Sequence, residues 1–237
     1  MIVRQWARGH LKGTGHRSVE HASMGIVIMR KVIIFLKRRA DVERSFFFDW
    51  LLNEHRPLVE KVPGLRRFTI SLEANGEDGV FDGLLEFWFN DAKAVEDAFA
   101  GLNGQAVIAD IQTHVLRLER VDLVEHKFVN TAKSAPFKLV AALKRRSDLT
   151  RAEFKSWWLD KHGPLVVVFP ELRRYQVDLV EDGPECFVDG IAEVSFADLA
   201  TLKRITSSMQ VKDAQEDSQV HTQARYRMFV EEHPVIH

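Results

Sequence analysis

The sequence contains very little cysteine. Cys186 is the only one among 237 residues, so one chain can form neither an internal disulfide nor a zinc or iron–sulfur site made of several cysteines. Such a chain suits a reducing compartment, and we expect a cytoplasmic protein. The sequence also lacks an apolar run of about 18 residues that would cross a bilayer, and residues 1–25 lack the continuous apolar core of a secretory signal. We therefore expect no membrane partner.

An excess of charge of either sign is also missing. The chain has 33 Lys and Arg residues against 34 Asp and Glu, a net charge of -1 and a pI near 6.8. It therefore has no overall attraction to nucleic acid, and we expect no nucleic-acid partner. A Gly-rich phosphate loop, a dinucleotide fingerprint and a Gly-x-Ser-x-Gly elbow are absent as well, which argues against nucleotide-dependent enzymes and serine hydrolases.

The most prominent feature present is a tandem repeat. Segments 36–67 and 143–174 both run from Leu-Lys-Arg-Arg through a tryptophan to His-x-Pro-Leu-Val and Leu-Arg-Arg. The offset is about 107 residues, and about 30 of about 91 aligned pairs are identical without a gap. A repeat of this length is as large as a domain. We predict an N-terminal tail at 1–29, similar domains at 30–129 and 137–237, and a linker of small and polar residues at 130–136.

The periodicity of apolar residues predicts the same elements in each copy. An apolar, β-branched run is typical of a buried strand, and apolar residues at helical spacing follow it. Because Pro57 and Pro164 have no N–H to donate, the first helix should be interrupted near His55 and His162. The predicted elements of the first copy are a strand at 31–36, the first helix, strands at 67–73 and 80–89, a second helical region at 91–114 and a closing strand at 116–129.

The resulting order, β-α-β-β-α-β, is that of the ferredoxin-like fold, an antiparallel sheet with both helices on one face. The other face of such a sheet needs an apolar cover. With two copies in one chain, we expect the two sheets to pack against each other around a barrel-like core. The chain would then be a pseudo-dimer, and a further homo-oligomer is left open.

These motifs resemble the EthD family. The resemblance rests on Phe-Leu-Lys-Arg-Arg, on Trp50 followed by His55-x-Pro57-Leu-Val, and on Asp82-Gly-Leu-Leu-Glu-Phe-Trp, and it covers residues 31–128 and about 137–235. It implies the dimeric α+β barrel fold with both halves in one chain. Relatives of that barrel include cofactor-free cyclases, dehydratases and muconolactone isomerase, as well as haem-using monooxygenases and peroxidases. The fold therefore does not choose a reaction.

His55 and His162 are the candidate catalytic residues. Imidazole titrates near neutral pH and can move a proton without a cofactor. A neighbouring apolar cavity would lower the pKa of the ring and keep it neutral, as a base requires. The alternative is structural, because each histidine could hydrogen bond a carbonyl that the interrupted helix leaves free.

Six further residues are candidates for substrate binding. The aromatic ones could form the wall of a pocket, and in the second copy Gly163, where the first has Arg56, would open space beside His162. The acidic ones precede glycine at the start of a strand and share a face with Glu86 or Glu193, so they could assist proton transfer, or could instead form turns and ion pairs. The six are Trp50, Trp157, Trp158, Tyr175, Asp82 and Asp189.

No compact cluster of ligand residues in the sequence indicates a metal site, and we expect none. Haem remains open as a cofactor because it needs only one histidine and apolar space. The Lys-Arg-Arg runs at 37–39 and 144–146 could attract an anionic substrate or could be solvated strand ends.

The leading hypothesis is a cofactor-free lyase or isomerase. It would carry out dehydration, isomerisation, cyclisation or elimination on a small hydrophobic compound, aromatic or cyclic, with histidine as the general base. The alternatives are a non-catalytic module that binds a hydrophobic ligand and a haem-dependent monooxygenase of the same fold.

Overall fold

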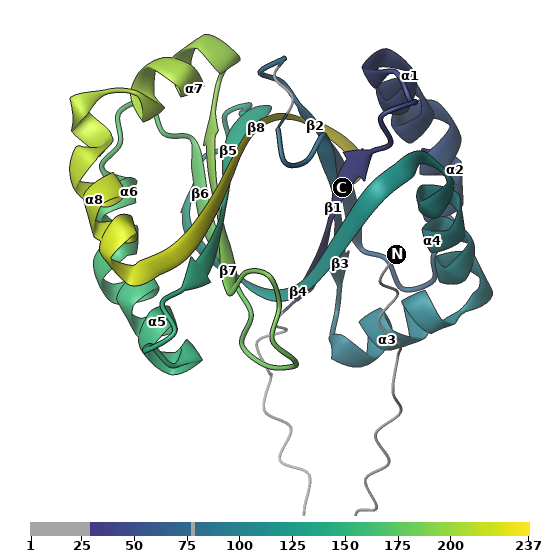
Figure 1. Cartoon of the computed structure of the whole chain (residues 1–237), viewed down its shortest axis with the longest axis horizontal. Helices are drawn as coiled ribbons and strands as arrows, with labels where there is room; N and C mark the ends of the chain where they lie inside the picture. The colour runs from purple at the N-terminus through teal and green to yellow at the C-terminus, as the bar shows by residue number, and fades with distance from the viewer. Residues whose placement is uncertain (1–28, 77–78) are drawn as a thin grey trace, which may run out of the picture.

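The computed structural model of the chain describes residues 29–76 and 79–237. It shows two modules with the same β-α-β-β-α-β order, which together form a dimeric α+β barrel within one chain (Figure 1). The fold predicted from the repeat and its periodicity is thus confirmed. The predicted N-terminal tail lies outside the described residues, apart from residue 29.

Within the described residues, eight antiparallel strands close into one barrel in the order β1-β3-β2-β8-β5-β7-β6-β4. The two long strands join the modules, because β4 pairs first with β1 and then with β6, and β8 pairs first with β5 and then with β2. The sheets are therefore also hydrogen-bonded edge to edge. The strands are β1 Arg30–Arg38, β2 Arg67–Glu73, β3 Gly83–Phe89, β4 Val115–Asn130, β5 Phe137–Arg145, β6 Arg174–Leu179, β7 Gly190–Phe196 and β8 Thr222–Ile236.

The helices lie outside the barrel, those of one module on the opposite side from those of the other (Figure 1). In the described ranges, no helix is long and apolar enough to cross a membrane. The first module has α1 Arg44–Asp49, the π-helical turn η1 Trp50–His55, α2 Arg56–Val59, α3 Ala92–Ala100 and α4 Leu102–His114; the second has α5 Arg151–Trp157, the π-helical turn η2 Trp158–His162, α6 Gly163–Val167, α7 Leu199–Thr206, η3 Met209–Val211 and α8 Lys212–His221.

The second helical region of each module is broken, where the sequence predicted one continuous segment. Gly101 has an extended backbone between α3 and α4, and a Cβ atom on Gly104 would lie 2.1 Å from the Ala98 carbonyl oxygen. The break lets α4 turn back closely over the end of α3. In the second module, η3 occupies the corresponding break.

Three apolar cores follow from the alternation of side chains along the strands. On β1, Val32 and Ile34 face the helices, whereas Ile33 and Phe35 face the barrel interior. Each module therefore has one core between its sheet and its helices, and the two modules share a third core inside the barrel. A site between helices and sheet therefore belongs to one module alone.

Candidate active site

Each predicted catalytic histidine ends a π-helical turn. The turns Trp50–His55 and Trp158–His162 interrupt the first helix of each module, and Pro57 and Pro164 follow two residues later. A proline inside a helix removes one backbone donor, and widening the preceding turn accommodates the loss. The interruption predicted from the prolines is present in both modules, and it directs both histidines toward the space between the helices and the sheet.

Both histidine rings are held by an aspartate from the last helix of their module. His55 Nδ1 lies 2.7 Å from Asp110 Oδ2, and His162 Nδ1 lies 2.8 Å from Asp217 Oδ2. Burial lowers the pKa of each histidine below the usual 6.5, although the aspartate raises it in part. Both rings are therefore neutral at pH 7. The two aspartates were not predicted, although each lies 55 residues after its histidine and they occupy equivalent positions of the repeat.

Tryptophan and a second histidine brace each pair. The Trp50 ring stacks on His114 with centroids 4.0 Å apart, and Trp157 stacks on His221 at 4.5 Å. In the second module Trp157 Nε1 also donates to Asp217 Oδ2 over 3.0 Å. Trp50 and Trp157, which were predicted to bind substrate, therefore pack against the histidine of each histidine–aspartate pair.

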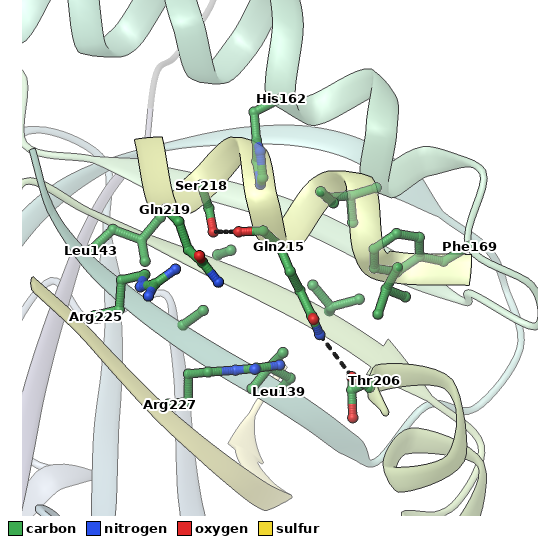
Figure 2. A pocket seen from close by; sticks show the side chains of 16 residues that line it. Leu139, Leu143, His162, Phe169, Thr206, Gln215, Ser218, Gln219, Arg225 and Arg227 are labelled. Carbon is green, nitrogen blue, oxygen red and sulfur yellow. Dashed lines mark hydrogen bonds between the residues drawn. The ribbon is translucent and has the colours of Figure 1, made fainter. Parts of the chain in front are cut away.

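A cavity of about 300 Å³ adjoins the pair of the second module (Figure 2). Its walls come from β5, β7 and β8 on one side and from η2, α6 and α8 on the other, and they are mostly apolar. His162 is one of the lining residues. Its Nε2 atom has no hydrogen-bond partner among the described residues, whereas His55 Nε2 is fully buried without one. The reactive edge of His162 thus borders open space.

The cavity exists in the second module because larger side chains fill the same space in the first. At six paired positions, the first module has an apolar side chain that packs in its core, and the second has a smaller or polar one at the cavity wall. The pairs are Ile34 and Ala141, Leu85 and Ala192, Phe87 and Val194, Phe99 and Thr206, Ile108 and Gln215, and Ile111 and Ser218. These differences were readable from the aligned repeats, but only the fold shows that they share one space.

The predicted aromatic wall of Trp158 and Tyr175 is not part of this cavity. Both side chains are fully buried in the core of the second module, where burial raises the pKa of the Tyr175 hydroxyl and keeps it protonated. The space expected beside Gly163 is also filled, since a Cβ atom there would lie 2.4 Å from the ring of Phe128. In the structure, Trp158 and Tyr175 pack rather than border the space next to His162.

Asp82 and Asp189 do not line this cavity, and they take the ion-pair role. Asp82 is 3.1 Å from Lys37 Nζ and accepts a hydrogen bond from the backbone N–H of Arg38. Asp189 is 3.1 Å from Lys144 Nζ, and it accepts a hydrogen bond from the backbone N–H of Arg145. The first two residues of each Lys-Arg-Arg run thus contact these carboxylates, whereas Arg39 and Arg146 pair with Asp41 and Asp148.

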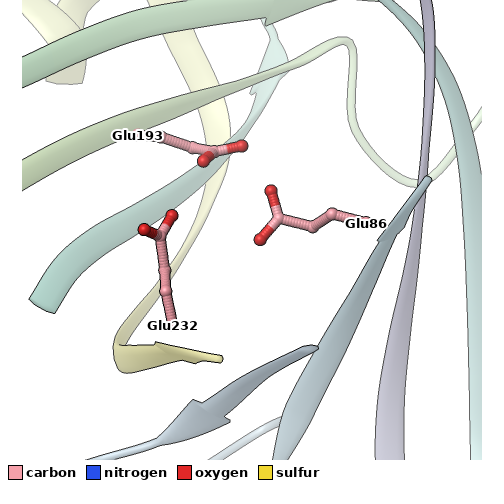
Figure 3. Close-up of side chains that lie close together, drawn as sticks. All are labelled: Glu86, Glu193 and Glu232. Carbon is pink, nitrogen blue, oxygen red and sulfur yellow. The ribbon is translucent and has the colours of Figure 1, made fainter. Parts of the chain in front are cut away.

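A second group of buried polar residues occupies the barrel interior. Glu86, Glu193 and Glu232 have oxygen atoms within 4.8 Å of one another, a spacing that a cation could bridge (Figure 3). Lys138 Nζ already contacts all three, at 2.5, 2.6 and 3.0 Å. Lys31 contacts Glu86 and Glu193 from the other side. The two ammonium groups therefore supply the positive charge that these carboxylates need.

Two buried carboxyl groups of this network have pKa values shifted in opposite directions. Burial would raise the pKa of Glu193, but Lys138 and Lys31 hold it well below its usual value. Burial raises the pKa of Asp178 well above its usual value despite the contact with Lys31. The two lysines therefore favour the ionised form of Glu193, whereas burial favours the neutral form of Asp178. We assign this network to joining the modules, because its residues come from both.

The fold is found among known structures that differ greatly in sequence. An anthrone oxidase-like protein aligns with a TM-score of 0.68 and 11% identity, over 89% of this chain and 93% of that chain. A mutant chlorite dismutase from Candidatus Nitrospira defluvii, in complex with cyanide, aligns with a TM-score of 0.57 and 12% identity, over 87% and 91%. At such identities these likenesses concern the fold alone.

An ethyl tert-butyl ether d (ethd) family protein from Bacillus halodurans c-125 is 21% identical, over 40% of this chain and 96% of that chain, with a TM-score of 0.36. No curated protein sequence matches the chain. The EthD domain matches residues 39–115 and 146–222, one segment in each module. Because these segments make up more than half of the sequence, the chain belongs to the EthD family.

Proposed function

We propose that the second module is a cofactor-free lyase or isomerase site in which His162 acts as the general base on a small aromatic or cyclic compound. The observation that carries this proposal is the cavity of about 300 Å³ beside a histidine whose other nitrogen is held by Asp217. This volume lies at the lower end of the range for small-molecule pockets. We also propose a cytoplasmic location, on the grounds of the single cysteine.

The hydrogen bond to Asp217 fixes the tautomer of the base. An ionised carboxylate only accepts hydrogen bonds, so the neutral imidazole donates from Nδ1 and carries its lone pair on Nε2. The second donor to the same carboxylate, Trp157 Nε1, keeps Asp217 in place. His162 is thus oriented with its basic atom on the side away from Asp217.

The chemistry follows from that arrangement. Nε2 takes a proton from a carbon next to a carbonyl, the C–H bond breaks, and its electron pair is delocalised into the carbonyl. The imidazolium, stabilised by Asp217, then returns the proton to another position or to a leaving group. Isomerisation, dehydration, elimination and cyclisation can all begin with this step. The apolar walls exclude water that would compete for the proton.

The first module supplies the scaffold in this proposal. His55 has the same aspartate partner, but it is fully buried and its Nε2 faces packed side chains. A substrate therefore cannot reach it without displacing the core. His55, predicted from the sequence as a second catalytic residue, is assigned the structural role of holding the interrupted helix to α4.

Exchange of a carbon-bound proton for solvent deuterium tests this proposal without knowledge of the full reaction. The protein would be incubated in D2O with bicyclic and tricyclic ketones and lactones, and deuterium uptake would be followed by NMR. We expect wild-type protein to accelerate exchange for at least one compound that it binds. Compounds that bind but never exchange would favour the non-catalytic binding module.

The pH dependence of this exchange should follow the neutral form of His162. Because burial lowers its pKa below 6.5, kcat/KM should rise with pH, reach half its plateau below pH 6.5 and stay constant through neutral pH. The measurement is kcat/KM for exchange between pH 4.5 and 8. A midpoint above 6.5, or a rate that falls as pH rises through this range, would show that the protonated ring is required.

A haem-dependent monooxygenase is the second candidate, because a histidine held by a carboxylate on Nδ1 is also a common metal ligand. His162 fits that role, but a cavity of about 300 Å³ suits two or three fused rings better than a tetrapyrrole. We therefore derive no step through haem. Addition of hemin to the purified protein should give no stoichiometric Soret shift, and a shift that His162→Gln abolishes would overturn this assignment.

A further inference from the structure

Two arginines at the cavity of the second module have no partner within the described ranges. Arg225 and Arg227 lie at alternate positions of β8, so both side chains leave the helix-facing side of the strand and extend toward the cavity (Figure 2). Neither side chain forms a hydrogen bond or ion pair with any described residue. Elsewhere on the closing strands, Arg120 is paired with Asp122 at 2.7 Å.

The presence of two arginines without partners at these positions is specific to the second module. The first module has Leu118 where the second has Arg225, and its Arg120, the counterpart of Arg227, pairs with Asp122. The two modules therefore share the histidine–aspartate pair but differ in charge around it. The two arginines without partners therefore lie in the same module as the cavity.

The surroundings of the two arginines leave their charge unbalanced. None of the residues that line the cavity is acidic. Both side chains are solvent-exposed at the edge of the cavity, and a guanidinium remains protonated at any pH the protein meets. Two like charges beside an apolar space form a site that an anion would stabilise.

We propose that the ligand of this cavity carries a carboxylate on an aromatic or cyclic body. The body packs against Ala192 and Val194, and the carboxylate binds Arg225 and Arg227. This inference rests on the proposed function, since it concerns the same cavity, and it narrows the substrate class to hydrophobic acids. Two guanidinium groups match a planar carboxylate better than a neutral amide because they have donors and no acceptor.

Calorimetric titration with two matched probes tests this inference. 2-Naphthoate and 2-naphthamide have the same ring system and nearly the same shape, but only the first carries a charge. We expect 2-naphthoate to bind at least tenfold more tightly, because a hydrogen bond to a charged group contributes more than a neutral one. Raising the salt concentration should weaken only the binding of 2-naphthoate.

Variants identify the arginines as the source of this preference. Arg225→Leu installs the residue of the first module, and Arg227→Met keeps the apolar stem without the charge. Each should weaken 2-naphthoate about tenfold and leave 2-naphthamide unchanged, and Arg225→Lys should recover part of the loss. Arg120→Met, in the first module, is the matched control and should change neither titration.

The outcomes separate this inference from the proposed function. If both probes bind equally, if 2-naphthoate does not bind, or if the variants leave its affinity unchanged, the carboxylate site is overturned, whatever the exchange assay shows. If 2-naphthoate binds as expected but His162→Gln does not lower any exchange activity, the carboxylate site stands and the catalytic role of His162 is wrong.

Discussion

Replacement of His162 by glutamine is expected to lower kcat/KM for carbon-proton exchange by about a hundred- to ten-thousandfold, the usual contribution of a positioned acid or base. Glutamine is polar and of similar size, so the fold is retained while the basic nitrogen is lost. The measurement is the rate of deuterium uptake under the same conditions as for the wild type. Circular dichroism verifies that the variant is folded.

The equivalent change in the first module is the matched control. His55→Gln alters the same motif, where the ring is fully buried and bonded to Asp110. We expect it to leave the exchange rate unchanged and to lower the free energy of unfolding by about 1–3 kcal/mol. Equal losses of activity in both variants would contradict a single working module, and no loss in either would rule out histidine as the base.

Replacement of Lys138 by methionine is expected to destabilise the protein by about 3–5 kcal/mol, because it removes one of the two ammonium groups that neutralise the buried carboxylates. Lys138 is fully buried, and its ammonium group contacts Glu86 of the first module and Glu193 and Glu232 of the second. Urea unfolding with linear extrapolation measures the change. Because these contacts cross between modules, the loss should appear in the unfolding of the whole barrel.

Two further variants make this result interpretable. Lys93→Met removes an exposed ion pair with Asp97 and should leave the free energy of unfolding almost unchanged. Adding Glu193→Gln to Lys138→Met should recover part of the stability, since it removes one of the negative charges that Lys138 no longer neutralises. A loss below about 1 kcal/mol for Lys138→Met alone would show that the network does not hold the modules together.

The tandem repeat made most of the fold predictable from the sequence. A sheet with helices on one face must cover its other face, and a second copy in the same chain provides the cover. The sequence did not predict that β4 and β8 continue into the other module and close the barrel by hydrogen bonds. The polar interior was also unpredictable. Lys31 and Lys138 pair with carboxylates of strands that lie far apart in the sequence, so no local pattern marks them as buried.

The candidate site was only partly predictable. The prolines correctly placed an interruption at His55 and His162, since that effect is local. The aspartates that hold the histidines come from the last helix of each module, which no local pattern links to the histidines. Whether a module contains a cavity depends on the combined size of the side chains at six positions that only the fold brings together. Trp158 and Tyr175 lie in the core and not at the cavity wall. The space that we expected beside Gly163 is occupied by Phe128.

The location of a bound ligand tests the central claim most directly. A crystal structure of the protein with 2-naphthoate should show the ring system between β7 and α8 of the second module, with one ring edge in contact with His162 Nε2. Density for the ligand inside the barrel, or in the first module beside His55, would contradict the assignment of the site to the cavity of the second module.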